Sequence, residues 1–146
     1  MKTILLATDG SGSSERALAF AILLAQETGA SLEIVSVRPQ WSRAGVGTPT
    51  LELGKEDAPA HAAESATTRA RCAGVASTAH VLDGDTVTCI VDAARRLRAE
   101  LLVVGSRGRG SLSGAMLGSV SQALVRRSPI PVTIVRHAHA LNAARS

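Results

Sequence analysis

Short apolar runs alternate with helix-forming segments along the chain, and this alternation constrains the fold more than any other feature. Strands buried on both faces are nearly continuous apolar runs, so the pattern is typical of a parallel sheet covered by helices on both sides. The only aromatic residues are Phe20 and Trp41, so the core must be aliphatic. The pattern predicts strands at Lys2–Thr8, Ser31–Val37, Ala76–Leu82, Leu101–Val104 and Val132–Val135, and helices at Glu15–Thr28, Ala60–Ala73, Thr86–Arg98 and Gly114–Arg127.

Polar residues at the ends of these segments predict where the helices begin. Ser13 or Ser14 can cap the first helix, and Asp85 can cap the third. Residues Gln40–Pro59 hold glycines and prolines without a sustained period, which predicts a loop that runs into the second helix. The length predicts a single domain.

A glycine-rich loop follows the fourth predicted strand. Its glycines are Gly105, Gly108, Gly110, Gly114 and Gly118, and Arg107 and Arg109 add positive charge. Glycine lets backbone N–H groups approach an anion closely, and a helix N-terminus favours negative charge. The loop therefore favours phosphate binding over a flexible surface turn.

Ligands of such sheets bind beyond the carboxyl ends of the strands, where the strand order reverses. The segment Asp9–Ser13 follows the first strand and reaches the same edge as the glycine loop. We expect the two segments to face each other if these strands are neighbours. Asp9 alone could equally be a turn or cap residue.

Charge and cysteine content weigh against several classes of function. The net charge is +4, but no aromatic residues lie between the arginines to stack bases, so nucleic acid is an unlikely partner. Cys72 and Cys89 have no metal-ligand spacing. No apolar run approaches the length of a membrane span, and no leader opens the chain, so we expect a cytoplasmic protein.

Three motifs carry a resemblance to a known family: the spacing Gly105-x2-Gly108-x9-Gly118-Ser119, the opening Ile4-Leu5-Leu6-Ala7-Thr8-Asp9-Gly10, and the ending Pro129-Ile130-Pro131-Val132. With these motifs the chain resembles the universal stress protein (UspA-like) family. The glycine signature resembles that of its ATP-binding subgroup. The resemblance implies a universal stress protein domain over residues 1–136, followed by a short tail, 137–146. It also implies an adenine nucleotide alpha hydrolase-like α/β fold: a three-layer sandwich with a five-stranded parallel sheet in the order 3-2-1-4-5.

The resemblance further implies binding residues for ATP or AMP with Mg²⁺. The backbone of Val37 would recognise adenine, and Asp9 would lie near the ribose and the metal. Gly105 and Gly108 would line the ribose and first phosphates, and Gly118 and Ser119 would hold the distal phosphates. The predicted nucleotide-binding set is Thr8, Asp9, Val37, Gly105, Arg107, Gly108, Gly118, Ser119 and Val120, with Asp9 also the metal ligand.

Three functions stay open on the sequence. The leading one is a nucleotide-dependent switch or sensor in a stress response. The second is a slow ATP hydrolase, for which Asp9 is the only nearby acid and no P-loop lysine is present. The third is a nucleotide-independent dimeric interaction module. The resemblance implies a homodimer through the apolar strand Pro131–Val135, which would lie at a sheet edge.

Overall fold

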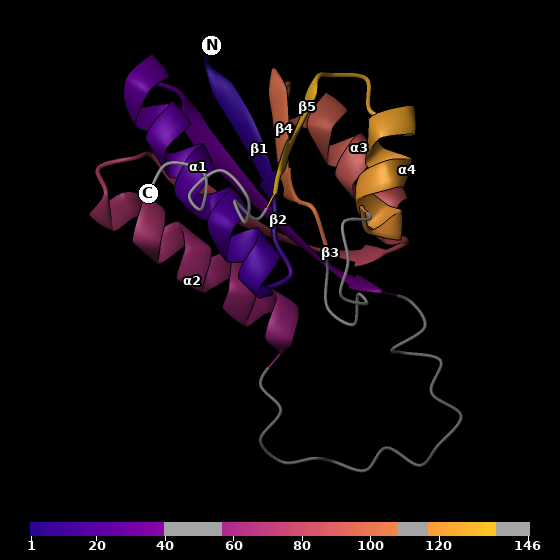
Figure 1. Cartoon of the computed structure of the whole chain (residues 1–146). Helices are drawn as coiled ribbons and strands as arrows, with labels where there is room; N and C mark the ends of the chain where they lie inside the picture. Colours follow the sequence, from indigo (N-terminus) through magenta and orange to yellow (C-terminus); the bar gives the residue numbers. More distant parts are fainter. Residues whose placement is uncertain (40–56, 108–116, 137–146) are drawn as a thin grey trace, which may run out of the picture.

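The computed structural model describes residues 1–39, 57–107 and 117–136. One parallel sheet runs in the order β3-β2-β1-β4-β5, which confirms the predicted topology (Figure 1). The predicted loop at 40–56, Gly108 and the tail at 137–146 lie outside the described residues. The strands are β1 (Thr3–Ala7), β2 (Ser31–Pro39), β3 (Ser77–Gly84), β4 (Leu101–Gly105) and β5 (Val132–Val135); the helices are α1 (Gly12–Thr28), α2 (Ala58–Cys72), α3 (Thr86–Arg96) and α4 (Ser119–Arg127).

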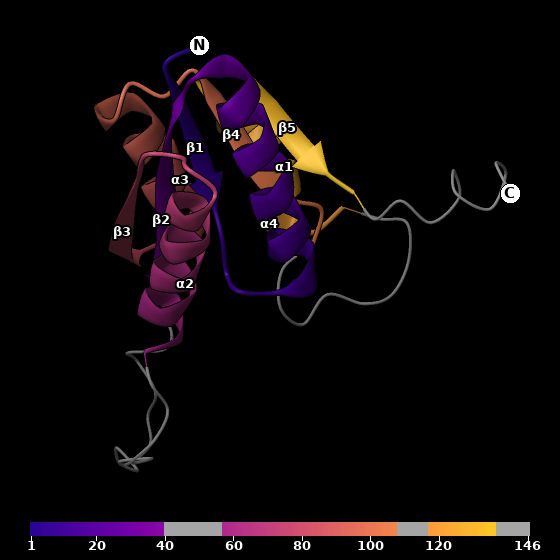
Figure 2. The same cartoon turned by 90° about the vertical axis from the view of Figure 1, so that its left-hand side faces the viewer.

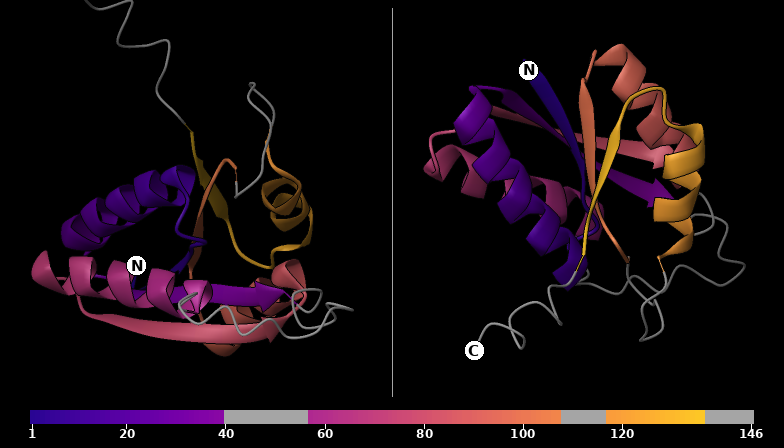
Figure 3. Two further views of the ribbon diagram at one scale, coloured as in Figure 1. Left: turned by 90° about the horizontal axis from the view of Figure 1, so that it is seen from below. Right: turned by 45° about the horizontal axis from the view of Figure 1, so that its top comes forward.

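Helices cover both faces of the sheet and complete the three layers. Figure 2 shows α1 and α2 in front of one face, and Figure 3 shows α3 and α4 across the sheet from them. Each face has its own apolar core: Ile4, Leu6 and Ile34 pack with α1 and α2, whereas Leu5 and Val35 pack with α3 and α4. Consecutive strand residues point to opposite faces, so both cores need apolar side chains. This explains why β1 and β4 are continuous apolar runs.

Two predicted helix starts were wrong. The helix α1 begins at Gly12, because the Oγ atom of Ser11 accepts a hydrogen bond from the amide of Ser14 at 3.3 Å. Neither Ser13 nor Ser14 is therefore the cap. The helix α4 begins at Ser119 with Gly118 as its N-cap, although helical spacing predicted a start at Gly114.

The starts of the other two helices follow ordinary capping rules. Asp57 caps α2, so this helix begins two residues before the predicted Ala60 and holds Pro59 in its first turn. Proline is tolerated there because first-turn amides need no partner within the helix. Asp85 caps α3 as predicted, with its Oδ2 atom 2.9 Å from the amide of Thr88. Among the described helices, none has the length and apolar character needed to cross a membrane.

Candidate functional site

The loops after β1 and β4 meet at the carboxyl edge of the sheet. The two strands are neighbours, with Leu6 opposite Val103 in the register. The amide of Arg107 donates to the Oγ atom of Ser13, in the first turn of α1, at 3.1 Å. The expected juxtaposition of these two segments is confirmed.

Gly105 allows this close approach. A Cβ atom at this position would lie 2.5 Å from the Oγ atom of Ser13 and 2.7 Å from its backbone carbon. Its carbonyl oxygen also accepts a hydrogen bond from the buried hydroxyl of Ser121 at 2.8 Å. Gly105 therefore holds the starts of α1 and α4 against the end of β4, in addition to lining the candidate site.

A cavity of about 600 Å³ lies at this edge of the sheet. This volume is typical of small-molecule and cofactor sites. It brings together six of the nine predicted site residues: Thr8, Asp9, Val37, Gly105, Arg107 and Val120. Its other lining residues are Ala7, Ser14, Val35, Ser36, Pro39, Ala58, Pro59, Thr86, Ile90, Val104, Ser121 and Leu124.

The remaining predicted residues have other places. Gly108 is not among the described residues. Gly118 is a lining residue of neither described cavity. Ser119 lines a second cavity of about 440 Å³ between the first turns of α3 and α4. The two cavities share Pro39, Thr86 and Val120, so they are adjacent.

All four described helices direct their first turns at the larger cavity. The contributions are Ser14 from α1, Ala58 and Pro59 from α2, Thr86 from α3, and Val120 and Ser121 from α4. This follows from the topology, because each crossover helix starts where a strand ends. The N-terminus of a helix carries a partial positive charge. The carboxylates of Asp57 and Asp85 already cap α2 and α3. The positive ends that can attract an anion, together with Arg107, are therefore those of α1 and α4.

The start of α4 is the most open of these helix ends. Its N-cap, Gly118, makes no side-chain cap hydrogen bond. Within the described part of the chain, the amides of Ser119 and Val120 have no hydrogen-bond acceptor. The amide of Gly118 is different, because it donates to the carbonyl oxygen of Ser106 at 2.7 Å. Any contact of Gly118 with phosphate would therefore come from atoms other than this amide.

The first loop has a structural role besides its place in the cavity. The Oδ1 atom of Asp9 accepts from the amide of Ser11 at 2.9 Å, and the Oγ1 atom of Thr8 accepts from Gly10 at 3.3 Å. These bonds form a turn of the kind that aspartate and threonine favour. The same turn sets the Asp9 carboxylate at the cavity wall. Asp9 thus acts as a turn residue and lies at the site.

The lining of the cavity combines an apolar part and a polar part. Side chains of Val37, Pro39, Pro59 and Ile90 form the apolar part, and Asp9, Arg107 and the start of α4 supply charge and donors. Such a cavity suits a ligand with one flat apolar end and one anionic end. Sequence analysis missed the wall from the start of α2, because no motif marks Ala58 or Pro59.

Thr86 and Ser121 were also missed. Thr86 lies at the start of a helix, and the strand before this helix ends at the same edge of the sheet. The predicted topology could therefore have identified Thr86 as a site residue. Its neighbour Asp85 has a lowered pKa, mainly because the amide of Thr88 donates to its carboxylate. That carboxylate is therefore committed to capping α3.

Comparisons with known proteins agree on one family. Residues 1–136 match the model described as the universal stress protein family. A universal stress protein of Thermus aquaticus is 36% identical over 139 residues, covering 92% of this chain and 98% of that protein. A universal stress protein solved in complex with cAMP is 27% identical, with a TM-score of 0.67 over 92% of this chain and 96% of its own. The universal stress protein UspA from Lactobacillus plantarum has the same fold, with a TM-score of 0.75, 23% identity, and coverage of 92% and 97%.

Proposed function

Because the chain belongs to the universal stress protein family, we propose that it binds an adenine nucleotide, ATP or AMP, and acts as a nucleotide-dependent switch in a stress response. The observation that carries the proposal is the cavity of about 600 Å³, whose lining combines apolar side chains with Arg107 and the start of α4. An adenine ring needs the first feature, and phosphates need the second. The relative solved with cAMP supports an adenine nucleotide as the ligand.

The lining residues favour one orientation of the nucleotide. The adenine would lie by Val37, Pro39 and Pro59, at the apolar wall. The phosphates would lie by Arg107 and the first turn of α4, where the amides of Ser119 and Val120 have no other acceptor in the described chain. Of the predicted residues Gly118, Ser119 and Val120, the last two would supply the backbone donors, because the amide of Gly118 donates to Ser106.

Asp9 fits the way in which proteins hold Mg²⁺ on a nucleotide. Mg²⁺ is often bound by one or two carboxylates together with substrate phosphates, not by a cage of protein groups alone. Asp9 supplies one carboxylate at the cavity wall, and no cluster of three metal-ligating residues exists among the described residues. Asp9 would therefore hold Mg²⁺ only together with the nucleotide, where the metal would neutralise phosphate charge.

Titration calorimetry with AMP and with ATP plus Mg²⁺ tests the proposal. We expect both nucleotides to bind, and we expect Arg107→Gln to weaken ATP binding about fivefold and AMP binding less, because the lost charge faces the phosphates. Arg126→Gln is the matched control, since Arg126 lies in the last turn of α4, away from the cavity. Absence of binding at millimolar nucleotide would contradict the proposal.

We also propose a homodimer formed through β5, which among the described strands pairs only with β4. The amide of Ser106 donates to Val135, so alternate residues of β5 direct their backbone groups to β4 and Ile134 directs its own outward. Analytical ultracentrifugation should give twice the 15.0 kDa chain mass. Ile134→Pro should give the monomer, because it removes an outward amide. A wild-type monomer at high concentration would contradict the dimer.

A further inference from the structure

Arg38 links three elements at the rim of the candidate nucleotide cavity. Its guanidinium contacts the carboxylate of Asp57, and its Nη1 atom lies 3.4 Å from the Oδ1 atom of Asp83. Arg38 and Asp83 are opposite each other in the β2–β3 register, and Asp57 is the N-cap of α2. The arginine therefore ties the first turn of α2 to the ends of two strands.

The residues next to this cluster are the ones that form the apolar wall. Ala58 and Pro59 follow Asp57 directly and line the cavity, and Pro39 follows Arg38 and lines it too. Ala62 and Ala63, in the turn after Pro59, are already buried, and Ala66 and Ala70 belong to the core. Ala58 and Pro59 are not among the buried residues of α2, so the cap and its ion pair add to core packing in fixing the position of the first turn.

We infer that Arg38 is a positioning residue for the adenosine end of the ligand: through Asp57 it holds Ala58 and Pro59 against Pro39, so that the wall is formed before the nucleotide arrives. The inference rests on the proposed nucleotide binding and adds a residue that no motif indicates. Arg38 itself does not line the cavity. It acts on the ligand only through the residues beside its partner.

The electrostatics of the cluster agree with a local role. The side chains of Arg38 and Asp57 are 35% and 39% exposed, and ion pairs this exposed add little to global stability. The pKa of Asp57 is lowered, mainly by its hydrogen bond with Arg38, so the carboxylate stays charged at neutral pH. Losing the pair should therefore loosen the first turn of α2 without unfolding the protein.

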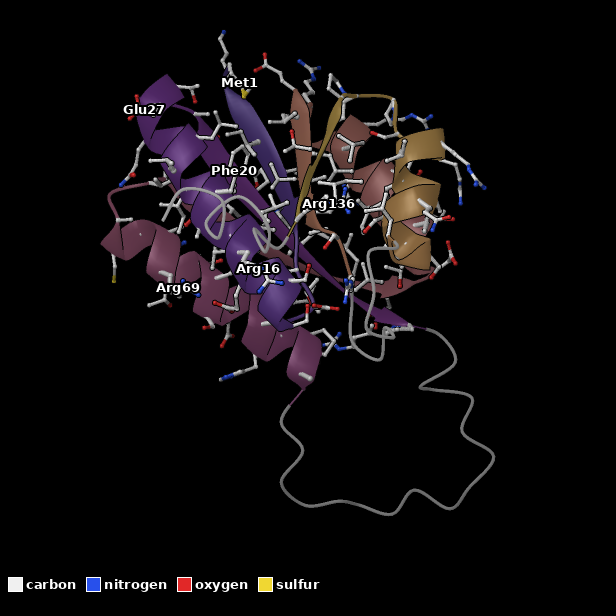
Figure 4. The ribbon with its side chains drawn as sticks, in the orientation of Figure 1. Met1, Arg16, Phe20, Glu27, Arg69 and Arg136 are labelled. Carbon is white, nitrogen blue, oxygen red and sulfur yellow. The ribbon has the colours of Figure 1, made fainter. Side chains whose placement is uncertain are left out.

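The test compares Arg38→Met with Arg69→Met. Methionine keeps an apolar stem and removes the charge. Arg69, on α2 in Figure 4, pairs with Glu15 and joins α2 to α1 by a similar exposed ion pair. Neither residue lines the cavity. Binding of adenosine, AMP and ATP to the full chain is measured by calorimetry, and thermal midpoints are measured alongside. Arg38→Lys is the conservative variant.

We expect Arg38→Met to weaken all three ligands by the same factor, about fivefold, because the wall contacts the part they share. Arg38→Lys should recover part of the loss, and Arg69→Met should bind like the wild type at a similar thermal midpoint. Unchanged binding by Arg38→Met would overturn the inference, as would a loss that grows with phosphate number or an equal loss in Arg69→Met. If the wild type binds none of the three, the proposed function fails and this inference with it.

Discussion

Replacing Gly105 by alanine is expected to destabilise the protein by about 3 kcal/mol, the upper part of the usual range for an overpacked position. The added Cβ atom would lie 2.5 Å from the Oγ atom of Ser13 and 2.8 Å from its backbone oxygen. A side-chain rotation cannot relieve contacts with the backbone, so the start of α1 must move away from β4. The hydrogen bond from Arg107 to Ser13 would be lost at the same time. Urea denaturation followed by circular dichroism measures the change in the free energy of unfolding.

Gly12→Ala is the matched control for Gly105→Ala. Gly12 lies one residue before Ser13, at the start of α1, and a Cβ atom there would meet only the Nη1 atom of Arg16 at 4.0 Å. Alanine favours a helix over glycine, so this variant should be neutral or stabilised by up to about 1 kcal/mol. A loss below about 0.5 kcal/mol in Gly105→Ala, typical of surface substitutions, would show that α1 can shift at no cost.

The fold could be predicted because β1 and β4, next to each other in the middle of the sheet, are almost entirely apolar. Leu5 and Leu6 are both fully buried, yet they belong to cores on opposite faces of the sheet. A strand with this property must lie inside a sheet covered on both sides. The order of the strands did not follow from this pattern. It came from the resemblance to a family, carried by motifs at the ends of β1 and β4.

The start of α4 could not be predicted from periodicity. Apolar residues at Met116, Leu117 and Val120 continue the helical spacing backward past Gly118. The helix begins only at Ser119, because Gly118 has an extended backbone and its amide donates to Ser106. That partner lies on the loop after β4, and a tertiary hydrogen bond of this kind leaves no periodic signal.

The candidate site was predictable only where a motif marks it. Asp9, Gly105 and Arg107 lie in the two loops that the sequence singles out, and all three line the cavity. Ala58 and Pro59 are the part of the cavity wall that α2 supplies. They follow a segment without a sustained hydrophobic pattern. Their place depends on the contact of Asp57 with Arg38, 19 residues earlier in the chain. Such a pairing between two elements cannot be inferred from the sequence before the fold is known.

Val120→Glu should separate nucleotide binding from stability more sharply than any other substitution. Val120 is 39% exposed, lies in the first turn of α4 and lines the cavity. A carboxylate there would occupy the place of the phosphates, so ATP binding should weaken at least tenfold, or about 1.4 kcal/mol. The same carboxylate interacts favourably with the helix dipole, so stability should stay unchanged or rise by up to about 1 kcal/mol. Calorimetry and urea denaturation of one preparation measure both.

Val125→Glu is the matched control at the other end of the same helix. Val125 is 55% exposed and lies near the end of α4, outside the cavity lining. A carboxylate there faces the negative end of the dipole, so stability should fall slightly while ATP binding stays as in the wild type. Thermal denaturation alone would show Val120→Glu as the more stable of the two variants. Only the titration would show that it binds ATP more weakly. If Val120→Glu binds ATP as tightly as the wild type, the phosphates do not lie at the start of α4, and the orientation proposed for the nucleotide is wrong.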